Sequence, residues 1–278
     1  MNGWIDLHIH SNYSDGLAAP QEILELVRQK GLSAFALCDH DNVQGYFKIK
    51  ELLRKDDPEL IPGVELSAGG DVDDIHILGY FFDPYSEVLN DALEVFRKRR
   101  NSRGEKMLLK LKDMGITVPL ELVLEIAGHS AIGRPHVADA LLRVGAISTY
   151  ESAFGRYIGN NCPAYVAKDN MIPEEATDLI HQVGGLAFLA HPGIGNAESY
   201  IEQLAHAGLD GIEIYHPNHS TYQIKMFAEM AKNYKMLVSG GSDYHGREGR
   251  FGMIGAQKVP SDILINMKQK LEKNRGCH

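Results

Sequence analysis

Two pairs of metal-binding side chains are spaced two residues apart in this chain: His8 with His10, and Asp243 with His245. Successive side chains of a β-strand point to opposite faces, so both members of such a pair can face one ion when the segment is extended. Imidazole and carboxylate groups together suit zinc, manganese and iron. We therefore interpret both pairs as candidate metal ligands.

Further histidine and acidic side chains lie at the ends of apolar β-type segments, His76 at the start of its segment and the others near the end. They are His40, Glu65, His76, His191 and His216. In parallel barrels the downstream strand ends converge on one face, where side chains distant in sequence meet. A glutamate among histidines can bridge two cations about 3.5–4 Å apart. The sequence thus predicts a multinuclear metal site at one rim of a barrel.

The competing interpretation is structural, because a single histidine at a strand end is more often a hydrogen-bonded group than a ligand. Two spaced pairs and several further residues at equivalent positions favour a shared purpose, which we take to be metal binding. Histidines on or beside expected helices lack that position, and we predict structural or surface roles for them. These are His129, His136, His181 and His206.

The elements that must position these residues alternate between β-rich and amphipathic helical segments, which is typical of parallel α/β folds. The expected strands are Trp4–His10, Ala34–His40, Leu60–Leu66, Ile75–Phe82, Leu186–His191, Gly211–Tyr215 and Met236–Ser239. The expected helices around them are Pro20–Lys30, Pro173–Val183, Ala197–Ala207, Thr221–Tyr234 and Ser261–Lys273. Proline in the first turn and glycine after the last turn support several of these helices.

The strand pattern stops between about Pro84 and Asn161, where helical patterning takes over. The expected helices there are Val88–Lys112, Pro119–Ala127 and Pro135–Val144. We predict a helical subdomain inserted between two parts of a barrel and capping its substrate site. The expected boundaries are 1–84 for the first part of the barrel, 85–161 for the insertion and 162–278 for the second part.

Composition narrows the class of protein. The chain has 278 residues, of which 44% are hydrophobic and 23% charged, and its formal net charge is −9. That charge disfavours duplex DNA and anionic membranes as partners. Cys38, Cys162 and Cys277 are odd in number and lack C-x-x-C spacing, which argues against a disulfide framework or a thiolate zinc site. We expect a cytoplasmic protein, because no leader-like segment or apolar run of membrane length is present.

Ordered motifs carry a family resemblance over nearly the whole chain. They are Asp6-Leu7-His8-Ile9-His10-Ser11, Ser14-Asp15-Gly16, Cys38-Asp39-His40-Asp41, Gly63-Val64-Glu65, Ala190-His191-Pro192 and Gly241-Ser242-Asp243-Tyr244-His245. Together they resemble the polymerase and histidinol phosphatase (PHP) family of metal-dependent, amidohydrolase-like phosphoesterases. The resemblance implies a distorted seven-stranded (β/α) barrel of PHP type.

The resemblance also implies three divalent metal ions. The positions that match the family pattern are His8, His10, Glu65 and Asp243 for the first ion, Asp15, His40 and His245 for the second, and His76 and His191, with Glu65 shared, for the third. Some family members have histidine where this chain has Asp15. Because a carboxylate is the harder ligand, this difference favours Mn²⁺, with Zn²⁺ and Fe²⁺ as alternatives.

The insertion resembles a subgroup that acts on nucleoside 3′,5′-bisphosphates and includes 5′-to-3′ exoribonucleases. The likeness rests on Ile132-Gly133-Arg134-Pro135-His136 and on Pro163-Ala164-Tyr165-Val166-Ala167-Lys168. It implies that Arg134 and Lys168 bind substrate phosphate. It also implies that His219 binds substrate, and we predict that His219 is the general acid. His216 is left without a role.

The expected reaction is hydrolysis of the 3′-phosphate of a nucleoside 3′,5′-bisphosphate such as pAp, by a water that two cations bridge and deprotonate. One alternative is 5′-to-3′ exonuclease action on short RNA oligonucleotides at the same site. Less favoured are a histidinol-phosphate phosphatase and a non-catalytic module that binds metal and nucleotide. We expect the cluster Arg97–Arg100 to form a solvated helix face, because Glu94 and Glu105 flank it.

Overall fold

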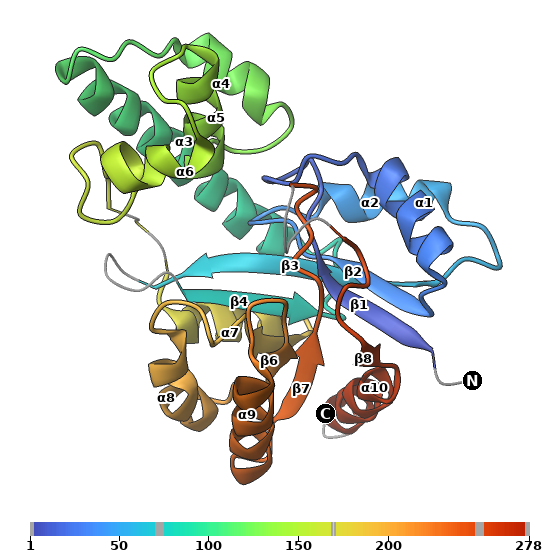
Figure 1. Ribbon diagram of the computed structural model, residues 1–278. Helices are drawn as coiled ribbons and strands as arrows, with labels where there is room; N and C mark the ends of the chain where they lie inside the picture. Colours follow the sequence, from blue (N-terminus) through green and yellow to red (C-terminus); the bar gives the residue numbers. More distant parts are fainter. Residues whose placement is uncertain (1–2, 70–74, 168, 170, 248–252, 276–278) are drawn as a thin grey trace.

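The computed structural model describes residues 3–69, 75–167, 169, 171–247 and 253–275 (Figure 1). Within these residues, eight strands form one sheet in the order β7-β6-β5-β4-β3-β2-β1-β8. Their bounds are β1 Trp4–Ile9, β2 Ala34–Leu37, β3 Glu59–Ala68, β4 Ile75–Tyr80, β5 Leu186–Leu189, β6 Gly211–Tyr215, β7 Leu237–Gly240 and β8 Val259–Pro260. The predicted α/β barrel is confirmed. The predicted count of seven omits β8, whose two residues pair with β1.

The direction of β4 departs from a parallel barrel. Strands β1, β2 and β3 are parallel to one another, as are β5, β6 and β7, but β4 is antiparallel to both β3 and β5. The start of β4 therefore lies beside the end of β3, where Ser67 pairs with His76. After β7, Tyr244 accepts a hydrogen bond from the His10 N–H at 2.8 Å. This contact nearly closes the barrel at the rim where the predicted ligands lie.

Helices cover the barrel and fill the insertion. Their bounds are α1 Pro20–Lys30, α2 Gln44–Leu52, α3 Glu87–Asp113, α4 Leu120–Ala127, α5 Arg134–Arg143, α6 Tyr150–Ala153, the π-helix η1 Phe154–Ile158, α7 Pro173–Gln182, the 3₁₀-helix η2 Ala197–Tyr200, α8 Ile201–His206, α9 Thr221–Asn233 and α10 Asp262–Arg275. The sequence did not predict α2, which begins after Val43 without a capping side chain. None of the described helices is long and apolar enough to cross a membrane.

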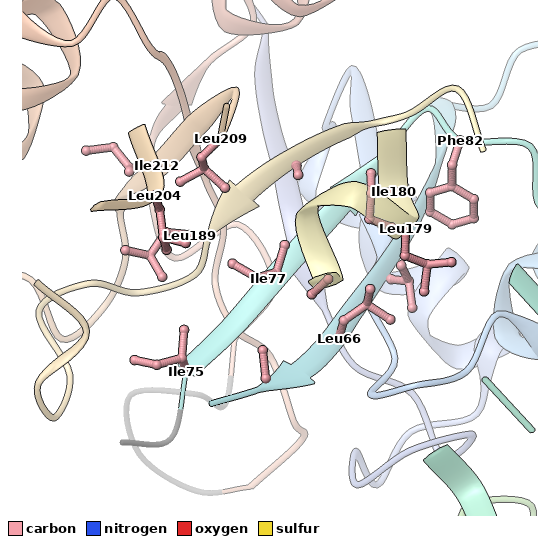
Figure 2. Close-up of a cluster of buried hydrophobic side chains, with 14 of the residues drawn as sticks. Leu66, Ile75, Ile77, Phe82, Leu179, Ile180, Leu189, Leu204, Leu209 and Ile212 are labelled. Atoms are coloured by element: carbon pink, nitrogen blue, oxygen red, sulfur yellow. The ribbon is translucent and has the colours of Figure 1, made fainter. Parts of the chain in front are cut away.

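Apolar side chains of α7 pack against β3 and β4 (Figure 2). Leu179 and Ile180 belong to the same buried cluster as Leu66 and Ile77. The approach is close at Gly79, where an added Cβ would lie 2.4 Å from Ile180 Cδ1. The strands that carry the rim residues are therefore backed by a tightly packed helix, which holds their ends in fixed positions.

The insertion has a hydrophobic core of its own, and α3 connects this core with the barrel (Figure 1). Near its start α3 contributes Leu93 and Phe96 to the barrel core, and near its end it contributes Met107 and Leu111 to the insertion core. Its 27 residues make a rod of about 40 Å at 1.5 Å per residue. The division at 84/85 and 161/162 remains a prediction, and α3 contributes to both sides of it.

Gly104 makes a close contact between α3 and the loop before α5. A Cβ at this position would lie 2.3 Å from Cγ2 of Ile132, which is buried. Alanine is ordinarily better than glycine inside a helix by about 1 kcal/mol. Overpacking of a buried contact costs about 1–3 kcal/mol, so here the steric effect dominates.

We therefore expect Gly104→Ala to lower the free energy of unfolding by up to about 2 kcal/mol, the steric cost less the gain in helix propensity. Urea unfolding followed by circular dichroism would measure the change. Gly155→Ala is the matched control, because a Cβ at Gly155 meets nothing within 4 Å. A Gly104→Ala protein as stable as the wild type would show that Ile132 moves aside at no cost.

Candidate metal centre and its capping pocket

The first predicted ligand group is brought together at the barrel rim. Single ligand atoms of His8, His10, Glu65 and Asp243 all lie within 4.8 Å of one another, and all four residues are buried. His8 and His10 come from β1 and the residue after it, Glu65 from β3, and Asp243 from the turn after β7. The i, i+2 spacing in an extended segment turns both imidazoles to the same side, as predicted.

The other two predicted groups lie directly beside the first. Asp15, His40 and His245 form a cluster within 4.8 Å that also includes His10. His40, Glu65 and His76 form another. His191, which was predicted beside His76, places its Nε2 atom 3.1 Å from Glu65 Oε1. All nine predicted metal ligands therefore belong to one continuous ring of side chains.

Glu65 occupies the middle of the ring. Its Oε1 lies 2.7 Å from His76 Nδ1 and 3.1 Å from His191 Nε2. Its Oε2 lies 3.2 Å from His8 Nε2, 3.1 Å from His10 Nε2 and 3.4 Å from His40 Nδ1. The two oxygens of one carboxylate thus face different groups of histidines, which is the arrangement expected of a residue that bridges cations.

The donor atoms of the ring suit divalent cations. His10 Nε2, Asp15 Oδ1 and His40 Nδ1 are buried and make no hydrogen bond of acceptable geometry. Buried polar atoms in folded proteins are normally satisfied by partners. Coordination to a cation would satisfy all three, and the nitrogen and carboxylate donors suit manganese, zinc or iron. The residues present therefore fit the implied metals.

Opposite charges outweigh burial in setting the pKa values of the ring carboxylates and of His10, whereas burial dominates for His40, whose pKa is lowered. Burial raises the pKa of the Asp15 carboxyl, but His245 and His40 lower it further, to well below its usual value. The pKa values of Glu65 and Asp243 are also lowered well below normal, because neighbouring histidines outweigh burial. For His10 burial lowers the pKa, yet the carboxylates of Asp243 and Glu65, 3.2 Å and 3.1 Å from Nε2, raise it to about 10. The metal-free ring thus holds ionised carboxylates and a protonated His10.

Metal loading is therefore expected to release protons and to strengthen as pH rises from 6 to 8. A raised pKa keeps His10 protonated across this range, and an imidazole must lose its proton before it can bind a cation. Calorimetric titration of the metal-free protein in buffers of different ionisation enthalpy would count the released protons. Proton-independent binding would contradict a role for this histidine as a ligand.

Buried carboxylates outside the predicted set hold the ligands in place. Glu213 in β6 accepts a hydrogen bond from His8 Nδ1 at 2.9 Å through Oε1, and from the His191 N–H at 2.8 Å through Oε2. Asp39 accepts from the hydroxyls of Ser11 and Ser14, each at 2.7 Å. Metal-binding histidines commonly use their second nitrogen in this way. Sequence reasoning missed Glu213, although an acidic residue inside an apolar strand was a usable signal.

A pocket of about 180 Å³ lies between the ring and the insertion. Its lining includes Asp15, His40 and His76 from the barrel, and Arg99, Arg100, Arg103 and Arg134 from α3 and α5. The expectation of a solvated arginine face is therefore wrong for Arg100, whereas Arg99 lines the pocket but is exposed, as expected. It remains apt for Lys98, whose exposed Nζ lies 2.6 Å from Glu94 Oε1.

Comparisons with known proteins place this geometry in a family. The model of the PHP domain matches residues 6–142. A 5′-3′ exoribonuclease of Haemophilus influenzae is 31% identical over 245 residues, 86% of this chain and 89% of that protein. The phosphoribosyl 1,2-cyclic phosphate 1,2-diphosphodiesterase of Eggerthella lenta is 31% identical over 265 residues, 92% of this chain and 99% of that protein. The chain belongs to the PHP family.

Further likenesses agree with this family. The 3′,5′-nucleoside bisphosphate phosphatase of Chromobacterium violaceum is 31% identical over 254 residues, 88% of this chain and 89% of that protein. A crystal structure from Bifidobacterium adolescentis, provisionally called a metal-dependent phosphoesterase, superposes with a TM-score of 0.85 at 26% identity, covering 95% of this chain and 94% of that one. This PHP protein is therefore a metal-binding hydrolase of phosphoester bonds, as the sequence predicted.

The residues that were predicted to bind substrate in this PHP protein differ in their positions and contacts. Arg134 lines the pocket at the start of α5, where its Nη1 donates to Asn160 Oδ1 at 3.0 Å. Lys168 lies outside the described residues. His216 places its Nε2 3.2 Å from Asp243 Oδ2 and therefore supports that carboxylate. His136 accepts the Gly133 N–H at 3.0 Å and caps α5, which fits the structural role expected of it.

His219 lies beside His216, and backbone groups hold its imidazole. Its Nδ1–H donates to the Ile214 carbonyl oxygen at 2.9 Å, and its Nε2 accepts the Gly193 N–H at 3.0 Å. Burial lowers the pKa of the His219 imidazole, which favours its neutral form. Both nitrogens thus bind backbone groups in this structure, and the roles of His219 in substrate binding and as general acid stay predictions.

Removing the charge of Glu213 is expected to weaken metal binding without removing a direct ligand. Loss of such a supporting carboxylate typically costs about 10- to 100-fold in metal affinity. We expect a loss of this size in Glu213→Gln, measured by competition with a chelating indicator. Glu59→Gln is the control, because Glu59 is exposed and pairs with Lys268 at 2.7 Å. Equal metal affinity in the two variants would exclude a supporting role for Glu213.

Proposed function

We propose that this PHP enzyme hydrolyses the 3′-phosphate of nucleoside 3′,5′-bisphosphates, such as pAp, and leaves the 5′-mononucleotide. The observation that carries the proposal is the pocket that ring residues and four arginines line together. A substrate with a phosphate at each end needs two separate sites for anions. A metal centre and guanidinium groups in the same pocket would supply both.

We further propose that the ring holds three divalent ions, with Mn²⁺ favoured and Zn²⁺ or Fe²⁺ as alternatives. Ions bound there would supply an acidified water as nucleophile and positive charge beside the phosphoryl oxygens. The chain itself contributes ionised carboxylates, since the pKa values of Glu65, Asp243 and Asp15 are all lowered. Glu213 holds His8 by its Nδ1 atom and thereby turns Nε2 toward the ring.

The insertion would hold the rest of the substrate, as the proposed capping role of residues 85–161 requires. The Arg134 guanidinium lies 6.0 Å from the centre of the Phe154 ring. A planar guanidinium can bind a phosphate through two parallel hydrogen bonds, and an aromatic ring can stack on a nucleobase. Both residues line the pocket, together with the apolar Ile132. We retain Lys168 as a further proposed phosphate ligand on the sequence likeness alone.

Exoribonuclease action on short RNA is the second candidate. A groove lined by Arg97, Lys98 and Asn101 follows α3 near the pocket. Such a groove could receive a chain that continues beyond the reacting nucleotide, and basic side chains favour a phosphate backbone. The exoribonuclease of H. influenzae has the same identity to this chain as the bisphosphate phosphatase of C. violaceum. We favour the bisphosphate because the arginines and the ring residues line one pocket of only about 180 Å³.

A turnover panel with added Mn²⁺ tests the proposal. The panel should contain pAp, 5′-AMP, 3′-AMP, histidinol phosphate, phosphoribosyl 1,2-cyclic phosphate and RNA of two to five nucleotides. We expect the highest kcat/KM with pAp. A higher value with RNA or with the cyclic phosphate would replace the proposed substrate. An Asp243→Ala preparation reveals any contaminating phosphatase, and no turnover of any compound by the wild type would contradict a catalytic role.

A further inference from the structure

We propose that Arg100 is a catalytic residue that contacts the reacting phosphoryl group, and that Asp41 is the residue that positions it. The inference rests on the proposed function, since it assumes that phosphoester hydrolysis takes place at the ring. It assigns to one arginine of α3 a role distinct from the role proposed for Arg134. The sequence alone favoured a solvated position for this arginine.

Arg100 is held from two directions. Its Nε lies 2.7 Å from Asp41 Oδ2 in an ion pair, and its Nη2 donates to the hydroxyl of Ser67. Asp41 Oδ1 in turn accepts the Ser67 N–H at 2.9 Å. These contacts form a closed triangle in which Asp41 is only 1% exposed. A long side chain that would otherwise lose rotamer freedom on binding substrate is thus already fixed.

The triangle lies at the edge of the ring. Asp41 directly follows His40, and its N–H donates to the Glu65 carbonyl oxygen at 3.0 Å. Ser67 pairs with His76 in the β3–β4 register. Both anchors of Arg100 are therefore immediate neighbours of proposed metal ligands, which places the guanidinium where a phosphoryl group bound to the ring would lie.

One edge of the guanidinium remains open. Among the described residues no acceptor contacts Arg100 Nη1, which lies 3.8 Å from the position of a Cβ built on Gly133. Gly133 and Arg100 both line the pocket. Because Asp41 engages Nε and Ser67 engages Nη2, the Nη1 edge can donate to a phosphoryl oxygen without breaking either contact. Donors fixed in this way stabilise charge as it develops in the transition state.

The backbone of Asp41 supports a functional role. Its φ angle is +50°, a left-handed conformation that non-glycine residues adopt at an energetic cost and that often occurs at active sites. Asp243, in the ring, has a φ angle of +49°. The local strain at Asp41 turns its carboxylate toward α3, where it meets Arg100.

Other pocket arginines have different surroundings. Arg99 is more exposed and pairs with Asp169 at 3.5 Å, and Arg134 donates to Asn160 within the insertion. Arg100 is tied to the barrel beside the ring through Asp41 and Ser67. Its contribution should therefore be the same for any substrate whose phosphoryl group reacts at the ring, whereas Arg134 should matter only for a second phosphate.

The decisive variant is Arg100→Lys, tested as the Mn²⁺-loaded enzyme with both pAp and 3′-AMP. Lysine keeps the charge but loses the planar set of donors. We expect kcat to fall about 100-fold for both substrates, as is typical when one donor to a transition-state oxyanion is lost. Inhibition by inorganic phosphate should weaken as well. Arg143→Lys on α5, an exposed arginine paired with Glu125 at 3.0 Å, is the control.

Two further variants separate catalysis from folding. Asp41→Asn keeps an oxygen for the Ser67 N–H but loses the ion pair with Arg100, so it should lower kcat. In the double variant with Arg100→Lys, kcat should be little lower than in Arg100→Lys alone. Added guanidinium ion should partly restore the kcat of Arg100→Ala, which a purely structural role would not allow. Circular dichroism and metal content should match the wild type in each variant.

Specific outcomes would overturn the inference. An unchanged kcat in Arg100→Lys, or a loss confined to pAp, would show that Arg100 does not contact the reacting group. A loss of kcat that follows lost metal would assign Arg100 a structural role. Failure of the proposed function would be seen in the wild type, which would prefer an ester other than the bisphosphate. The same variants would then test the role of Arg100 on that preferred ester.

Discussion

Glu65→Gln is expected to abolish stable metal loading and to lower phosphoester hydrolysis about 10³-fold or more, beyond the effect of losing one transition-state donor. The physical reason is the central position of this carboxylate, whose two oxygens lie 2.7–3.4 Å from the nitrogens of five histidines. Glutamine has nearly the same shape but carries no charge and only one oxygen. It cannot bridge two cations.

Elemental analysis of the dialysed protein would measure bound metal, and the turnover panel would measure activity. Glu59→Gln again serves as the control, because it makes the same chemical change on an exposed side chain of the same strand, β3. Circular dichroism should show that both variants fold. A Glu65→Gln protein that retains the metal content of the wild type would refute the bridging role and with it the proposed division of the ring.

Arg134→Ala is expected to remove the preference for a second phosphate. A hydrogen bond to a charged group contributes about 1.5–3 kcal/mol, so KM for pAp should rise about 10- to 100-fold, since 1.4 kcal/mol corresponds to tenfold. KM for 3′-AMP, which has no 5′-phosphate, should hardly change. The value of kcat should stay close to that of the wild type, because a contact made equally in the ground and transition states affects binding alone.

Steady-state kinetics with the two substrates would measure this selectivity, with Arg143→Ala as the control on the same helix. Equal rises of KM for pAp and 3′-AMP would place Arg134 at the reacting phosphate instead. Unchanged kinetics would remove it from the site. Together with Arg100→Lys, this experiment distinguishes the arginine tied to the ring from the arginine that belongs to the insertion.

Much of the ring was predictable because its chemistry depends on local spacing. His8 and His10 stand two apart in a strand, and the same spacing in Asp243 and His245 follows the last long strand. Strand ends that share one rim explain why residues so distant in sequence meet. His76 stands at the start of its strand, and the antiparallel direction of β4 accounts for its place beside Ser67.

The supporting groups were not predictable in this way. Glu213 reaches His8 across 205 positions of the chain, and Arg100 reaches Ser67 across 33 positions. Neither contact follows from a motif or a periodicity, since each depends on how a whole helix or strand is placed. The contacts of His219 were not predictable either. Its two nitrogens form hydrogen bonds with the backbone of Ile214 and Gly193.

The sequence by itself determined the alternating α/β pattern, the identity of the ring residues and the existence of a helical insertion. The α/β pattern, the insertion and most ring residues follow from side-chain type and from the periods of strands and helices, which are local, whereas Asp15 was assigned through the family resemblance. Only the tertiary structure decided that β4 runs in reverse, that Glu65 faces five histidines, and that α3 turns its arginines toward the ring. Those outcomes depend on packing between distant segments. The pocket that we propose binds the substrate beside the metal-binding rim forms only when α3 packs against the barrel.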